Sequence, residues 1–243
     1  MTIEEKLVKI AENQQKVFEA GKAQGGGGDS YYDVFWDALQ NKGNRKVYNS
    51  AFTEQGWDDE TFKPKYSIRP QSANNMFAEC NITNLKALLE RYGVELDFSG
   101  ITYNALSQVF ANSSITDLGV LDVSTSASLG YFLWYAKKLV NAEKIILSDD
   151  GNTTFPTTTF QSCGALVEIR FEGVIGKDFD IHWSKSLSAE SYHSIITHSS
   201  KNASFTLTLP PEETVRSVYD TKHGSGAWDT ITAEYSNLTI AYM

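Results

Sequence analysis

The side chains best suited to acid–base chemistry or metal binding are four histidines, His182, His193, His198 and His223. His193 and His198 lie in or near an expected helix, and their spacing of five residues does not put them on one helical face. Neither HExxH nor a cysteine–histidine zinc spacing occurs. The histidines therefore predict no metal site and no catalytic base, and we expect no cofactor.

Other short motifs in the sequence also fail to predict a catalytic or ligand-binding site. Residues 25–28 are all glycine, but no GK[ST] sequence and no preceding strand accompany them, so they do not form a phosphate loop. Gly224–Gly226 lacks the strand–turn–helix setting of a nucleophile elbow. Asp149–Asn152 has oxygen ligands for calcium, but it follows an expected strand and has the composition of a plain turn. We expect a protein that is not an enzyme.

Bulk composition narrows the class of partner. The 243 residues carry a formal net charge of −9 with only 21 Lys and Arg, which disfavours nucleic acid. The N-terminus is acidic and no apolar run reaches secretory or transmembrane length, so we expect synthesis in a cytoplasm and no membrane insertion. A hydrophobic content of 41% is enough for a real core.

A recurring segment is the strongest structural signal. Each copy has a bulky lead residue, a small residue three positions later, and aliphatic residues that run into a strand. The copies are Phe77–Leu85, Phe110–Leu118, Phe160–Ile169 and, more loosely, Leu133–Ala142. Cys80 and Cys163 occupy the small position of two copies, so we expect buried free thiols rather than a disulfide. Self-similarity of this kind predicts stacked units.

The units require strands, with helical pieces between them. Period-two alternation predicts strands at 94–98, 118–123, 144–147, 167–171, 205–209 and 238–242. Helices are expected at 85–91, at 187–196 with Ser188 as N-cap, and from Pro210 to Tyr219. Residues 76–209 are then a repeat body, and 210–243 are a C-terminal cap.

The N-terminal third has a different character. Residues 1–20 predict a heptad helix, with a candidate oligomer seam at Ile3, Leu7, Ile10, Gln14 and Val17. Leu at a and Ile at d favours three or four strands, so we expect a homo-oligomer, with a trimer favoured; a helix lying on its own domain is the alternative. Residues 21–28 form a Gly-rich tether. Residues 29–75 are rich in aromatic side chains and are expected to cap the first unit, although a sugar-stacking platform is also consistent with them.

Outward strand positions form the expected partner surface. The candidate binding face consists of Glu95, Asp97, Lys144, Glu168, Arg170 and Glu172. A merely solvated sheet face explains the same polar residues equally well.

At the repeat signature the chain resembles the irregular leucine-rich repeats of the BspA type. Phe77, Cys80, Ile82 and Leu85, with their counterparts in the later copies, carry this likeness over residues 76–209. It implies an α/β fold: an irregular leucine-rich-repeat solenoid with an N-terminal helix (a short coiled coil) and an aromatic cap. The layout of helix, tether, cap and repeats is also similar to proteins of phage and prophage tail gene clusters in gut Gram-positive bacteria.

These resemblances imply a binding or structural role. The leading hypothesis is a virion tail component, made in the host cytoplasm, that recognises a protein or glycan on a host surface or another tail protein. A bacterial cell-surface adhesin is the alternative. A carbohydrate-active enzyme has only the aromatic-rich cap in its favour.

Overall fold

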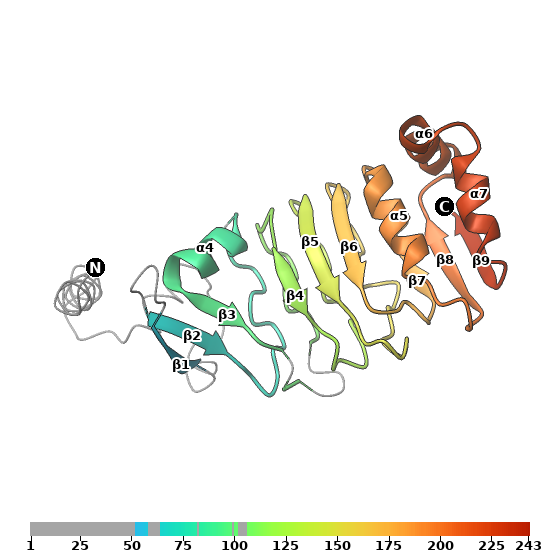
Figure 1. The fold of residues 1–243 in the computed structure, drawn as a ribbon. Helices are drawn as coiled ribbons and strands as arrows, with labels where there is room; N and C mark the ends of the chain where they lie inside the picture. Colours follow the sequence, from blue (N-terminus) through green and yellow to red (C-terminus); the bar gives the residue numbers. More distant parts are fainter. Residues whose placement is uncertain (1–51, 58–63, 82, 99, 102–105) are drawn as a thin grey trace, which may run out of the picture.

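The computed structural model describes residues 52–57, 64–81, 83–98, 100–101 and 106–243. The expected heptad helix with its seam, the Gly-rich tether and most of the aromatic cap lie outside the described residues. Within the described part, short strands lie side by side in one row that follows the order of the chain (Figure 1). Helices are interspersed along this row, so the protein contains both α and β structure.

The strands of the described residues form three sheets of three. The first contains β1 (Phe52–Trp57), β2 (Pro64–Ile68) and β3 (Val94–Leu96); β1 pairs antiparallel with β2, and β2 pairs parallel with β3. The second contains β4 (Val120–Asp122), β5 (Asn141–Ile146) and β6 (Glu168–Glu172), and the third contains β7 (Phe179–Asp180), β8 (Phe205–Leu209) and β9 (Leu238–Tyr242). Every pair in these two sheets is parallel.

Helices begin and end where local capping permits. Helix α4 (Leu85–Tyr92) starts at Asn84, whose side chain accepts a hydrogen bond from Ala87 N, and stops at Gly93, which has a φ of 61°. Helix α5 (Ala189–Thr197) starts at Ser188, whose hydroxyl accepts from Ser191 N, so the predicted cap is confirmed. Helices α6 (Glu212–His223) and α7 (Ala227–Ala233) follow near the C-terminus.

The four repeat copies are in hydrogen-bonded register. Phe77 N donates to Val109 O at 2.8 Å, Phe110 N donates to Phe132 O at 3.0 Å, and Leu133 N donates to Thr159 O at 3.0 Å. The first three lead residues therefore each bond to the carbonyl that precedes the next lead residue. The loose copy at Leu133 occupies the same place in this pattern as the other three.

Left-handed backbone recurs at matching positions of these copies. The residue before each small position has a positive φ: 58° at Glu79, 52° at Asn112, 57° at Tyr135 and 65° at Ser162. Three copies have a second such residue two positions before the lead, namely Asn75, Gln108 and Tyr131. We call the segments 75–80, 108–113, 131–136 and 158–163 the turn ladder. Their shared geometry shows that they are one structural unit repeated.

One continuous core joins all the described units, from Ile68 to Tyr235. Phe77 stacks on Phe110 with ring centroids 5.3 Å apart, and Phe110 meets Phe132 edge-on at 5.2 Å. Cys80 and Cys163 are both buried and are not joined in a disulfide, as expected. Burial raises the pKa of the Cys163 thiol to about 12, so this sulfur is a packing group and not a nucleophile.

The structure also contains elements that the sequence did not reveal. A fifth unit uses Ile181, Ser184 and Leu187, all buried, and Ser184 Oγ donates to Cys163 O at 3.1 Å. Strand β7, helix α7 and the β1–β2 pair were not expected. Because β2 pairs with β3, the predicted boundary at residue 75 falls within the span of a single sheet.

Candidate functional site

Helix α5 takes the place of a strand beside β6 in the row of Figure 1. The backbone amides of Ile169 and Phe171 in β6 donate to the hydroxyls of Ser191 (2.9 Å) and Ser194 (2.8 Å). The Ser191 hydroxyl in turn donates to Val167 O at 3.0 Å. Side-chain hydroxyls thus satisfy a strand edge that would otherwise be an unpaired row of donors.

A groove lies where this sheet gives way to the helix. It has a volume of about 360 Å³ and is lined by side chains from β5, β6, α5 and the end of α6. The residues that line it are Lys144, Arg170, Phe171, Glu172, Glu190, His193, Ser194, Thr197, His198 and His223. Three of the six residues predicted for the binding face, Lys144, Arg170 and Glu172, are among them.

The sheet side of the groove carries paired charges. Lys144 Nζ lies 2.8 Å from Glu172 Oε2 across the β5–β6 pair. Arg170 Nη2 lies 3.8 Å from Glu168 Oε2 on the same strand, at the edge of ion-pair range. Both pairs are solvent-exposed, so they contribute little to stability and exchange readily for a charged partner.

The helix side carries three imidazoles. His193 Nδ1 is 2.9 Å from the hydroxyl of Tyr219, and the His193 and His223 rings stack with centroids 5.6 Å apart. His198 Nδ1 lies 2.9 Å from Ser194 O, so that nitrogen carries the proton and donates to the carbonyl. Sequence reasoning separated His193 from His198 by helical angle. His198 follows the last helical residue as the C-cap, where that angle no longer applies.

The groove perturbs its ionisable groups. Partial burial of the ring, with His223 and His198 nearby, lowers the pKa of His193, and Glu190 opposes this effect. The pKa of Glu190 is lowered by a backbone hydrogen bond and by Lys222, whose Nζ lies 3.2 Å from Glu190 Oε1. Burial also raises the pKa of Tyr219, which keeps its hydroxyl protonated. With neutral imidazoles the lining is balanced in charge, and each proton taken up makes it more positive.

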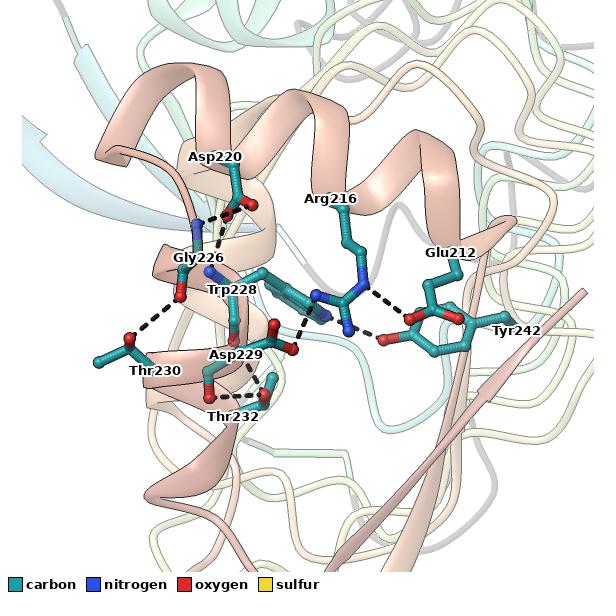
Figure 2. Close-up of polar contacts among 9 residues, drawn as sticks. All are labelled: Glu212, Arg216, Asp220, Gly226, Trp228, Asp229, Thr230, Thr232 and Tyr242. Carbon is teal, nitrogen blue, oxygen red and sulfur yellow. Dashed lines mark hydrogen bonds and ion pairs between the residues drawn. The ribbon is translucent and has the colours of Figure 1, made fainter.

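The C-terminal elements hold His223 at the rim. Figure 2 shows Asp220 of α6 accepting hydrogen bonds from Gly226 N (3.1 Å) and Trp228 N (2.8 Å), which caps the start of α7. Arg216 bridges Glu212 and Asp229 at 2.7 Å each, and Trp228 Nε1 donates to the Tyr242 hydroxyl at 2.9 Å. Helix α6 is thereby fixed against α7, which is itself bonded to β9, and the last residue of α6 is His223.

Two predicted face residues lie elsewhere. Glu95 and Asp97 belong to the region of the first sheet, where Glu95 is in register with Ser67. Arg69 Nε donates to Asp97 Oδ2 at 2.6 Å. Glu168 is on β6 but does not line the groove. The structure therefore brings Lys144, Arg170 and Glu172 together and leaves the other three outside the groove.

The lining of the groove is mostly polar and charged. Within the described ranges, no group of three or more His, Cys, Asp or Glu side chains is arranged to hold a metal ion. Asp150, considered above for calcium, accepts hydrogen bonds from Ser148 and Asn152 in a local turn. In the same described part of the chain, no helix combines the length and the apolar character needed to cross a bilayer.

Comparison of the chain with known protein families, with curated protein sequences and with solved structures finds no match in any of the three.

Proposed function

We propose that this protein is an irregular leucine-rich-repeat solenoid that binds other molecules and has no catalytic activity. Its proposed role is that of a phage or prophage tail component that recognises a host-surface ligand or another tail protein. The register of the four copies supports the repeat fold. The resemblances in the repeat signature and in the layout of the chain support the role.

One observation carries the binding proposal. Lys144 and Arg170 from neighbouring strands face the same groove as His193 and His198 from the helix that follows. Such a set offers charged and neutral hydrogen-bonding groups on rigid elements, which is what recognition of a polar ligand requires.

Binding of fluorescently labelled protein to a panel of gut Gram-positive cells tests this proposal. The double variant Arg170→Ala/His193→Ala should lose binding by about tenfold or more, because both sides of the groove lose a contact. Arg91→Ala, an exposed arginine on α4 outside the groove, is the matched control and should bind like the unmodified protein. Equal binding by the double variant and the control would remove the groove from the proposal.

Oligomeric state and location are tested separately. Sedimentation of the full chain should give a trimer, and Ile10→Asp in the proposed seam should give a monomer. Antibody labelling of induced virions should mark the tail. Labelling of intact uninfected cells, with none on virions, would favour an adhesin instead.

A further inference from the structure

Three aromatic side chains gather on one rung of the turn ladder. Tyr131 and Trp134 meet edge-on with ring centroids 5.8 Å apart, and Trp134 and Tyr135 do so at 4.7 Å. Tyr131 keeps 42% of its surface exposed, and the other two are half-buried. We call Tyr131, Trp134 and Tyr135 the aromatic trio; none of them lines the groove.

Neighbouring rungs carry small or polar residues at the same places. The register equates Tyr131 with Asn75 and Gln108, Trp134 with Ala78, Ala111 and Gln161, and Tyr135 with Glu79, Asn112 and Ser162. The stacking of the units therefore does not require aromatic rings here. A cluster of partly exposed aromatic rings that the stacking does not require is a sign of an interaction site.

Two of the rings also occupy unfavourable backbone positions. Tyr131 has a φ of 59° and Tyr135 a φ of 57°, a conformation that bulky side chains rarely adopt. Asparagine, which two other rungs use at these places, tolerates the left-handed region far better. Asparagine would serve the fold at these positions with less backbone strain. Strain that is retained with tyrosine therefore points to a role in binding.

The polar and charged groups around the aromatic trio indicate the chemistry of its partner. Trp134 Nε1 donates to Gln161 Oε1 at 3.0 Å, which fixes the indole ring, and Lys137 Nζ lies 4.9 Å from the centre of the Tyr135 ring. The chain has a net charge of −9, yet residues 123–142 contain Lys137 and Lys138 and no acidic residue. Among the described residues, no carboxylate forms an ion pair with either lysine.

We propose that the aromatic trio, together with Lys137 and Lys138, is a binding site for an acidic glycan, a sugar chain whose pyranose rings carry carboxylates. The apolar C–H face of a pyranose packs on tyrosine and tryptophan rings, and these residues offer large, rigid contact area at low entropic cost. The ring carboxylate then meets two ammonium groups that form no ion pair among the described residues, although Lys138 Nζ donates to Ser114 Oγ at 3.5 Å. This site lies apart from the groove and does not depend on it.

Biolayer interferometry on the full chain tests the proposal with three uronic-acid chains: polygalacturonate, alginate and hyaluronate oligosaccharides. At least one should bind and quench tryptophan fluorescence. Its neutral form, such as methyl-esterified polygalacturonate, should bind less tightly, and so should poly-L-glutamate, which has the charge without the sugar rings. Binding should weaken with added salt, because part of it is electrostatic.

The matched variant Tyr131→Asn/Trp134→Ala/Tyr135→Asn gives this rung the side chains of its neighbours and should keep its circular dichroism spectrum and cooperative melting. It should lose uronate affinity by about tenfold or more, as expected when anchor aromatics are removed. Lys137→Asn/Lys138→Ser should lose the preference for the charged over the esterified chain.

Three results would overturn the proposal: no binding to any of the uronates, full binding by the folded triple variant, or poly-L-glutamate binding as tightly as the glycans. The groove variant Arg170→Ala/His193→Ala should bind uronates normally. Its behaviour therefore separates a failure of this site from a failure of the proposed function.

Discussion

At the scale of single residues, the turn ladder fixes backbone conformation more strictly than side-chain identity. The same left-handed positions hold Asn, Gln, Glu, Ser and Tyr. In the first three units the residue before the small position donates its main-chain amide to the next rung: Glu79 N to Ala111 O at 2.9 Å, Asn112 N to Trp134 O at 3.0 Å and Tyr135 N to Gln161 O at 2.9 Å. The strain of a positive φ at these three residues is accepted because the bond satisfies a backbone donor.

Glu79→Gly should stabilise the protein. Glu79 is exposed with a φ of 58°, and relief of a left-handed cost of about 1–2 kcal/mol outweighs the added chain entropy of about 0.5–1 kcal/mol. We expect the free energy of unfolding to rise by about 0.5–1 kcal/mol in urea titrations. Ala78→Gly, one residue earlier and outside the left-handed region, should lower it instead. The same sign for both variants would contradict this account.

Acidification should destabilise the protein through His193. Its pKa is lowered in the folded state, so the unfolded chain binds more protons below the ordinary histidine value of about 6.5. The stabilising effect is complete above that value and is lost as the pH falls through it toward the lower folded pKa. Melting temperature measured from pH 8 to pH 5 should fall less steeply for His193→Gln. An NMR titration of His193 with its midpoint at or above the ordinary value would disprove the assignment.

At the scale of elements, helix α5 is the chief irregularity. Its serines replace a strand as the partner of β6, and it supplies His193 and the C-cap residue His198 to the groove, while His223 comes from α6. The helix therefore both stabilises the edge of β6 and contributes side chains to the proposed binding site. If a strand replaced α5, its side chains would alternate between the two faces of the sheet, and His193 would not stand above the sheet surface.

Ser194→Ala should cost about 1–3 kcal/mol of unfolding free energy, because it leaves the buried amide of Phe171 without an acceptor. Ser217→Ala on the exposed face of α6 is the control, and its effect should stay within about 0.5 kcal/mol. Chemical denaturation monitored by circular dichroism measures both. If Ser194→Ala matched the control, the hydroxyl would not be a true substitute for a strand.

Sequence patterns anticipated the elements whose periodicity is local. The expected strands at 205–209 and 238–242 coincide with β8 and β9, and the cap at Ser188 was identified from its side-chain chemistry. The fifth unit was not predicted from the sequence because its lead residue is Ile181 rather than a phenylalanine. Helix α7 was not predicted because its capping side chain belongs to Asp220, six residues before Gly226. No local sequence motif indicates a cap at that distance.

The groove could be predicted only in part, for a related reason. Strand alternation identified Lys144, Arg170 and Glu172 as outward residues. The meeting of His193 with His223 depends on how α6 packs against α5, and on the bonds that fix α6 to α7 and α7 to β9. Long-range packing of that kind leaves no periodic signal in the chain.

At the scale of the whole molecule, the most extensive contacts between the described elements join neighbours in the row. Stability in such an arrangement is the sum of units and their interfaces, and the end units depend on closure. The C-terminal end is closed by α6, α7 and β9, held by Asp220, Arg216 and Trp228 (Figure 2).

Asp220→Ala should therefore loosen one end of the protein only. It removes the acceptor for two amides at the start of α7, at a cost of about 1–2 kcal/mol. Hydrogen exchange should accelerate in α6, α7 and β9 and remain unchanged in β4 and β5. Asp220→Asn, which keeps one acceptor oxygen, should have a smaller effect. Uniform acceleration along the chain would show instead that the protein unfolds as a single cooperative block.

The hydrogen bond from the amide of one lead residue to the carbonyl just before the next lead residue has a genetic consequence. A tandem duplication of the 27 codons for residues 133–159 would place a second Leu133 directly after the first Thr159, where the original leucine amide already finds its acceptor. The added segment would end on an identical threonine, so the downstream phenylalanine would meet its usual neighbour. Recombination between copies can thus lengthen or shorten this protein in whole steps, and homologues that differ by such steps should retain every remaining interface unchanged.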